Sequence, residues 1–232
     1  KERLKHMRQT VDVLSMTATP IPRTLYLSIM GARDMSVITT PPRDRLPVHT
    51  EVIPFDADRI AESILREIDR GGQVFFLHNR VVTIEEQAEW LKELLPDVRF
   101  RVAHGQLPER KLERVMVDFM EHKFDVLVTS MIIQSGLDMP NVNTILVDRA
   151  DTFGLAELYQ LRGRVGRSSH RAFAYLMIPP DRQLNSKSRR RLRAIEEHSD
   201  LGAGFRVAMR DLEIRGAGNL LGNEQHGFIT AV

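Results

Sequence analysis

Cysteine is absent from the 232 residues, which excludes disulfide bonds and thiolate metal sites and fits a reducing cytoplasm. No apolar run approaches the ~20 residues that a membrane-spanning helix requires. No signal-peptide pattern opens the chain. Neither His78 nor His104, which lie in polar loops discussed below, has partners at metal-ligand spacing. We therefore expect a cytoplasmic protein with no membrane contact and no metal site made by protein side chains alone.

The chain also lacks a strong excess of one charge. It has 33 Lys and Arg against 31 Asp and Glu, a formal net charge of +2, so overall charge does not predict a nucleic-acid partner. Locally, residues 182–193 contain six basic residues and no acidic one. Such a run is most often the solvated face of a helix, and by itself it identifies no ligand.

A phosphate-binding loop of the form G-x-x-x-x-G-K-[ST] is missing as well. No Asp-Glu pair follows an apolar strand to hold magnesium. Any nucleotide site predicted for this chain must therefore be half of a site, completed by residues from another domain.

Strand and helix patterns alternate from residue 46 onwards. Asp56 is placed to cap the first helix, and Thr83 with Glu86 has the spacing of a capping box for the second. This alternation predicts an α/β fold: a doubly wound, mostly parallel sheet with helices on both faces. The strands are expected at residues 48–54, 74–77, 99–103, 126–128, 144–147 and 172–178.

Changes in character divide the chain into three regions. Residues 1–45 show short strand patterns at 11–16 and 35–39 around an apolar helix, and they end in a linker at Pro41-Pro42. So few elements cannot bury a core, so this region needs a partner domain. Residues 46–180 form the regular α/β part. Residues 181–232 are expected to form a helical hairpin followed by a glycine-rich stretch, which is either an ordered loop or a flexible tail.

Polar residues follow three of the predicted strands at their carboxyl ends. In an open parallel sheet ligands gather at this edge. Any one of these loops alone is better explained as ordinary surface polarity. Together they predict a polar edge suited to phosphate oxygens, such as those of a nucleic-acid backbone. The loops are His78-Asn79-Arg80, His104-Gly105-Gln106 and Thr129-Ser130.

The most specific pattern lies in residues 155–168, which read LAELYQLRGRVGRS. It places Gln160 three residues before Gly163, and Arg164 and Arg167 three residues apart. Guanidinium groups suit phosphate oxygens, and glycines allow close approach of the backbone. A lone R-G-R would be a solvated basic turn, but the full pattern predicts a phosphate-facing arginine pair.

Gly136 and Asp138 follow the strand at 126–128 closely. Asp138 could orient an arginine of the Gln160 pattern or meet a ribose hydroxyl. A cap or turn aspartate explains it about as well, so the alternatives stay open.

Five stretches resemble helicase motifs in their order and spacing. TATPIPRT (17–24) resembles motif III, VFFLHNRV (74–81) motif IV and HGQL (104–107) motif IVa. VTSMIIQSGLDMPNVNTILV (128–147) is similar to motif V, and the Gln160 pattern to motif VI. The set matches the second RecA-like lobe of superfamily 2 helicases and translocases, preceded by the end of the first lobe.

Residues 204–227 resemble the "translocation in RecG" motif, found in RecG-type fork helicases and in transcription-repair coupling factors. The opening KERLKHMRQTVDVLSMTATPIPRTL, the linker SVITTPPRDRLPV and the ending GAGNLLGNEQHGFI are similar to the coupling factor family, over essentially the whole chain. Three positions depart from the expected pattern. Gln134 and Asp148 stand where glutamates are expected, and Glu157 where glutamine is expected.

The resemblance implies an ATP-driven double-stranded DNA translocase that displaces stalled RNA polymerase and recruits an excision-repair damage-recognition protein. ATP and Mg²⁺ would be held mainly by the first lobe, so this chain alone should be inactive. Motif VI would act on the γ-phosphate, and the glycine-rich loop would couple lobe closure to DNA movement. The implied roles are catalytic for Gln160, Arg164 and Arg167; nucleotide-binding for Gly136, Asp138 and Gly163; DNA-binding for Arg80, His104, Gly105, Thr129 and Ser130; and coupling for Thr17, Thr19, Arg210, Arg215 and Gln225.

Two other interpretations remain at this stage. A RecG-type fork-remodelling helicase would share the motor lobe and differ in its flanking domains. A non-catalytic DNA-binding module would fit the missing phosphate loop. An assay of ATP hydrolysis by the chain in the presence of DNA would separate the non-catalytic module from a helicase.

Overall fold

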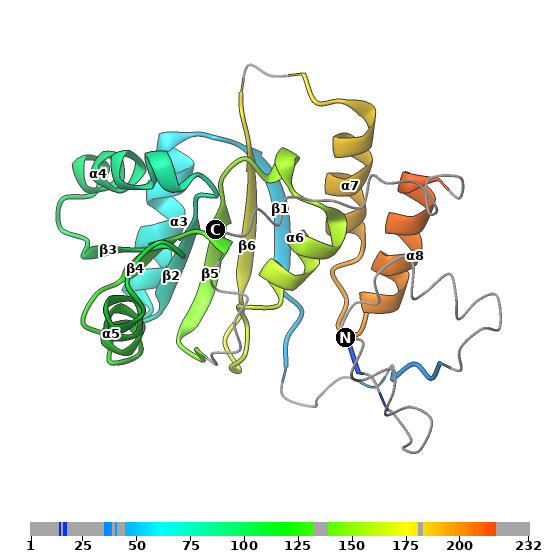
Figure 1. Cartoon of the computed structure of the whole chain (residues 1–232), viewed down its shortest axis with the longest axis horizontal. Helices are drawn as coiled ribbons and strands as arrows, with labels where there is room; N and C mark the ends of the chain where they lie inside the picture. The colour runs from blue at the N-terminus through cyan, green and yellow to red at the C-terminus, as the bar shows by residue number, and fades with distance from the viewer. Residues whose placement is uncertain are drawn as a thin grey trace.

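The computed structural model describes residues 45–131, 139–180 and 183–216, together with Leu14, Met16, Thr17, residues 35–38 and Thr40. Within this part of the chain the central feature is a six-stranded sheet, ordered β1-β6-β5-β2-β4-β3, in which every pair is parallel (Figure 1). The predicted fold class is confirmed. The strands are β1 (His49–Pro54), β2 (Gln73–Leu77), β3 (Phe100–Ala103), β4 (Val126–Thr129), β5 (Val142–Val147) and β6 (Phe173–Ile178).

One face of the sheet is covered by α3 (Ala57–Asp69) and α4 (Ile84–Leu94), with the short η1 (Val81–Thr83) before α4. Side chains alternate along β2, so Val74 and Phe76 point to this face and pack with Ile60 and Ile64 of α3 and with residues of α4. Asp56 caps α3 as predicted, accepting a hydrogen bond from the Arg59 backbone N–H at 2.9 Å.

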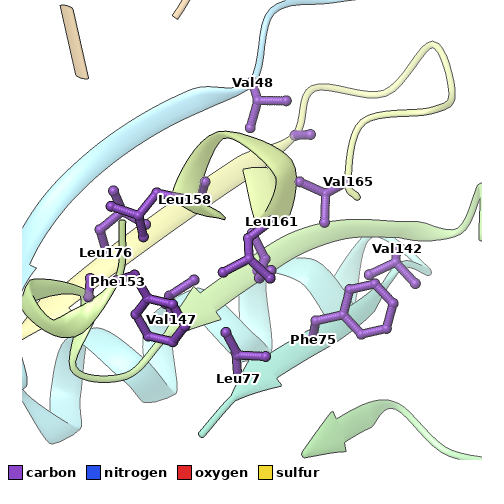
Figure 2. Close-up of a cluster of buried hydrophobic side chains, with 14 of the residues drawn as sticks. Val48, Phe75, Leu77, Val142, Val147, Phe153, Leu158, Leu161, Val165 and Leu176 are labelled. Atoms are coloured by element: carbon purple, nitrogen blue, oxygen red, sulfur yellow. The ribbon is translucent and has the colours of Figure 1, made fainter. Parts of the chain in front are cut away.

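The other face is covered by α5 (Glu109–Met120), α6 (Leu155–Arg162), α7 (Ser186–Glu197) and α8 (Gly204–Arg215), with η3 (Ala150–Thr152) before α6. Phe75 and Leu77 point to this side. Leu158 and Leu161 of α6 pack over β5, as Figure 2 shows. The helices α7 and α8 form a hairpin that packs on α6, so the predicted helical hairpin is present.

The capping prediction for α4 was wrong. Thr83 makes no side-chain cap on α4, because its hydroxyl lies 2.8 Å from Nε2 of His78. Leu65 of α3 and Met120 of α5 lie at the margins of the apolar faces of their helices and are 41% and 43% exposed.

The first region gives little regular structure where it is described. Residues 35–38 lie outside any strand, contrary to the prediction for 35–39. Leu14, Met16 and Ile38 are each 86% exposed. The apolar helix expected before residue 35 lies outside the described residues. Within the described part of the chain, no helix has the length and apolar character needed to cross a bilayer.

Candidate functional site

The motif VI residues converge on one pocket at the amino-terminal edge of the sheet. Helix α6 starts beside the carboxyl end of β5 and runs back across the face, so its last turn lies near the beginning of β1 and β5 (Figure 2). The pocket has a volume of about 270 Å³. Its walls include four residues predicted from the sequence: Gln160, Gly163, Arg164 and Arg167.

Packing fixes the loop that carries the two arginines. Val165, between them, is fully buried against the core. Gly166 has φ +71°, and a Cβ on it would lie 2.9 Å from Cβ of Ala172 and 3.2 Å from Cγ2 of Val48. A side chain at position 166 is therefore excluded both by space and by backbone conformation. Beyond Arg167, Ser168 donates a hydrogen bond to Oδ1 of Asn143 at 3.0 Å.

Arg162 has a different role from the other arginines of the motif. It is 5% exposed and donates hydrogen bonds to the carbonyl oxygens of Ile195 at 2.8 Å and His198 at 2.7 Å. Its guanidinium also lies 4.9 Å from the ring centroid of Tyr159. Burial lowers the pKa of this guanidinium. Arg162 therefore holds the end of α7 to α6, a role that the sequence pattern, which assigned only Arg164 and Arg167, did not predict.

Arg164 is partly buried, whereas Arg167 is exposed at the mouth of the pocket. Burial, and then the positive charge of Arg167, lower the pKa of Arg164. Two guanidinium groups thus line one partly desolvated pocket. Such an arrangement suits an anion such as a phosphate.

The pocket is also lined by two segments that the sequence did not predict. One is Arg45, whose guanidinium donates hydrogen bonds to the carbonyl oxygens of Gly166 at 3.2 Å and Gly163 at 3.4 Å. The other is the turn of residues 199–202, which joins α7 to α8. The available signals were weak: one arginine among several in a proline-rich linker, and a Gly-containing turn.

The far end of the hairpin carries another predicted residue. Nε of Arg215 donates to Oδ2 of Asp211 at 2.9 Å, and Asp211 is 1% exposed. A Cβ added at Gly154, the N-cap of α6, would lie 3.9 Å from Arg215, so α8 ends beside the start of α6. Arg210 is on the solvent side and pairs with Glu213 at 2.7 Å. The hairpin therefore reaches from the arginine pocket to the opposite edge of the sheet.

The predicted polar loops do lie together at the carboxyl edge. Leu77 of β2 and Ala103 of β3 are both in register with Thr129 of β4. The loops that begin at His78, His104 and Ser130 are therefore neighbours. This edge is separated from the arginine pocket by the length of the strands, roughly 15–20 Å.

Side chains at this edge differ in exposure. Arg80 and Gly105 are exposed, whereas Thr129 is fully buried and Ser130 is 7% exposed. The hydroxyl of Thr129 donates to the Ser130 carbonyl at 3.1 Å. Nδ1 of His104 is buried and has no hydrogen-bond partner among the residues that the structure describes. Burial leaves both the Thr129 hydroxyl and Nδ1 of His104 poorly placed to meet a ligand.

The His78 side chain is fixed by other side chains and is buried. Its Nδ1 lies 2.7 Å from Oδ2 of Asp148, its Nε2 lies 2.8 Å from the Thr83 hydroxyl, and it is 7% exposed. Asp148, one of the departures from the family pattern, thus pairs with His78 and fixes the base of the loop that carries Arg80. Glu157, another departure, accepts a hydrogen bond from the Gly154 N–H at 2.7 Å and caps α6.

Some predicted residues lie outside the described residues: Thr19, Gln134, Gly136, Asp138 and Gln225. Thr17 is described and exposed. Among the residues that the structure describes, no three His, Asp or Glu side chains form a group that could hold a metal ion.

Known proteins match this chain over its whole length. A family model for the helicase conserved C-terminal domain matches residues 57–169. Over all 232 residues the chain is 54% identical to the transcription-repair-coupling factor of Staphylococcus epidermidis and 53% identical to that of Staphylococcus aureus. The chain belongs to the transcription-repair coupling factor family of superfamily 2 helicases. The match covers 100% of this chain and 20% of each relative, so the chain spans a fifth of their length.

Solved structures place this coupling factor segment among helicase lobes. RecG bound to a three-way DNA junction matches with a TM-score of 0.71 and 35% identity, over 90% of this chain and 28% of that chain. Dbp5 of S. cerevisiae, bound to RNA and ADP BeF3, matches with a TM-score of 0.52 and 16% identity, over 84% of this chain and 45% of that chain. The second likeness shows the fold alone, which is that of a RecA-like C-terminal helicase lobe.

Proposed function

We propose that this chain is the second motor lobe, with its adjoining translocation hairpin, of an ATP-driven double-stranded DNA translocase. In the whole protein the motor displaces stalled RNA polymerase and couples transcription to nucleotide excision repair. One observation carries the proposal. Gln160, Gly163, Arg164 and Arg167 line a single pocket, in a chain that is 54% identical along its whole length to a transcription-repair-coupling factor.

The pocket fits a triphosphate better than a neutral ligand. Arg164 and Arg167 crowd two positive charges into it, and burial lowers the pKa of Arg164. ATP supplies the phosphoryl group whose transfer to water drives the motor. In this proposal the two arginines stabilise the negative charge that develops on the γ-phosphate, and Gln160 orients the reacting groups. One arginine in this role raises the turnover rate roughly 10³–10⁵-fold.

Magnesium has no set of protein ligands among the described residues. In this proposal magnesium, like ATP, is held mainly by the other lobe, as the family resemblance implies, and no step in this chain depends on it.

The carboxyl edge is proposed to hold DNA through its backbone. The exposed Arg80 side chain and the exposed backbone at Gly105 offer hydrogen-bond donors that suit phosphate oxygens. Phosphate contacts carry no sequence information, which suits a motor that must move over any sequence. The buried hydroxyl of Thr129 shapes the strand end rather than touching DNA.

The hairpin of α7 and α8 gives the two edges a mechanical connection. Its turn at residues 199–202 lines the arginine pocket, and α8, about 18 Å long, ends at Arg215 near the start of α6. A change in the pocket would therefore move the other end of α8. In this proposal that movement is coupled, through the segment after Gly216, to movement of the DNA.

The likeness to RecG supports a second candidate, a fork-remodelling helicase, because it covers 90% of this chain at 35% identity. The two candidates give different products. The test gives the intact protein two substrates in separate reactions. One is RNA polymerase stalled on a linear duplex, and the other is a three-way DNA junction. We expect ATP-dependent release of the polymerase and little junction unwinding. Junction unwinding without polymerase release would favour the second candidate.

A matched control completes this test. Arg59→Ala removes an exposed arginine on α3, whose partner Glu51 lies 2.9 Å away at the surface. It should release polymerase at the rate of the unmodified protein. Absence of both activities in the unmodified protein would overturn the proposed function.

A further inference from the structure

Arg45 connects the segment before β1 to the loop that presents the motif VI arginines. Its guanidinium donates from Nε to the Gly166 carbonyl at 3.2 Å and from an Nη atom to the Gly163 carbonyl at 3.4 Å. These two carbonyls lie on either side of Arg164. One planar side chain therefore spans the turn from which Arg164 and Arg167 project.

The carbonyl of Gly163 explains why an arginine suits this place. Gly163 is the C-cap of α6, and the last carbonyls of a helix have no partner within the helix. A cation there also interacts favourably with the helix dipole. The guanidinium has a rigid fork of donors, so it can serve both carbonyls at once, which a single ammonium group does poorly.

Packing ties the same two segments together a few residues further on. Val48 is 4% exposed and its Cγ2 would lie 3.2 Å from a Cβ at Gly166. The His49 N–H donates to the Ala172 carbonyl at 2.9 Å. Figure 2 shows Val48 and Val165 at the same end of α6. The segment entering β1 and the arginine loop therefore move as one unit.

We propose that Arg45 is a positioning residue of the ATPase reaction, acting through the loop of residues 163–166 and not on the nucleotide itself. This inference rests on the proposed function, because it assumes that Arg164 and Arg167 act on ATP. Arg45 lies in the stretch that leads from the first region into this lobe. Displacement of that stretch when the lobes close shifts both arginines together, so lobe movement and the geometry of the reaction are directly linked.

The test measures DNA-stimulated ATP hydrolysis by the intact protein carrying Arg45→Ala, Arg45→Lys or the control Arg59→Ala. A misplacement of about 1 Å in a catalytic group costs about 100-fold in rate. We expect Arg45→Ala to lower kcat roughly 10- to 100-fold, while the KM for ATP changes by less than about threefold. Arg45→Lys should fall between Arg45→Ala and the unmodified protein, since it reaches one carbonyl. Arg59→Ala should match the unmodified protein.

Each other result contradicts the inference. An unchanged kcat in Arg45→Ala means that the two hydrogen bonds do not position the loop. A raised KM with kcat unchanged means that Arg45 contacts the nucleotide directly. If Arg45→Ala melts below the assay temperature, Arg45→Lys decides, and a kcat equal to that of the unmodified protein overturns the inference. An unmodified protein without DNA-stimulated hydrolysis would instead refute the proposed function, and this inference would fall with it.

Discussion

At the scale of single residues, the three arginines of motif VI divide into two kinds. Arg162 is buried and donates to the last carbonyls of α7, whereas Arg164 and Arg167 line the pocket. The sequence pattern predicted the pair at 164 and 167 because three-residue spacing puts side chains on one side of a turn. It could not show where Arg162 points, because that depends on the position of α7, which lies more than twenty residues later.

Arg162→Ala should act on stability. The substitution removes two hydrogen bonds from a charged donor and leaves two carbonyls of the hairpin unpaired in a buried place. The expected loss is about 2–4 kcal/mol in the free energy of unfolding. Urea unfolding of the 232-residue chain measures it, with the exposed Arg193→Ala as the control. A loss below 0.5 kcal/mol would show that Arg162 does not hold the hairpin.

At the scale of the elements, an ion pair links the residues just before the edge strand β3 and its neighbour β4, beside their parallel ladder. Arg99 donates to both carboxylate oxygens of Asp125, at 2.7 and 2.9 Å, and its backbone N–H donates to the same carboxylate at 3.0 Å. Burial acts to raise the pKa of Asp125, but the hydrogen bonds and charge of Arg99 outweigh it, so the pKa is lowered.

Asp125→Asn should therefore destabilise the fold in a pH-dependent way. A carboxylate with a lowered pKa contributes stability above its unfolded pKa of ~3.9, and the contribution is lost as the pH falls through the lower folded value. Arg99 is largely exposed, so solvent screens the pair and we expect only about 1–2 kcal/mol at pH 7. Urea unfolding from pH 7 down to pH 3 should show the difference between the variant and the unmodified chain shrinking below pH 4. A difference that does not change with pH would contradict this account.

The hairpin of α7 and α8 gives a second prediction at this scale. Arg215→Ala together with Gln225→Ala, in the intact protein, should leave DNA-stimulated ATP hydrolysis largely in place and abolish translocation in a triplex-displacement assay. Arg215 pairs with the buried carboxylate of Asp211, so its loss loosens the end of α8 far from the arginine pocket. Arg193→Ala, which removes a 78% exposed arginine from α7, is the control. Equal loss of both activities would mean that this end of the hairpin helps to build the ATP site.

Most elements could be predicted from the sequence because local patterns decide them. The apolar run at residues 74–77 gave β2, and Asp56 before an amphipathic stretch gave α3. The failures have non-local causes. Thr83 has the spacing of a capping box, but its hydroxyl is hydrogen-bonded to His78. His78 is fixed in turn by Asp148, which follows a different strand. Arg45 was missed for the same reason, since its partners lie more than a hundred residues away.

At the scale of the whole molecule, the predicted site residues lie at two separate edges of the sheet. The polar loops end up together at the carboxyl edge because β3, β4 and β2 are neighbours in register. The arginine pocket lies at the amino edge because α6 runs the length of the sheet between them. The proposed function requires this separation, since a motor holds nucleotide and DNA at different places and connects them by a rigid body. The hairpin and α6 provide that connection.

The central claim is that Arg167 acts on ATP held by another lobe and contributes little to the stability of this one. The most direct measurement is DNA-stimulated ATP turnover of the intact protein carrying Arg167→Ala, beside its melting temperature and its affinity for ATP. The expected result is a loss of turnover of about 10³-fold or more. The melting temperature should stay within about 2 °C of the unmodified protein, because Arg167 is exposed at the pocket mouth and its removal should cost under about 0.5 kcal/mol. Turnover within tenfold of the unmodified protein, or a fall in melting temperature as large as that of Arg162→Ala, would contradict the account.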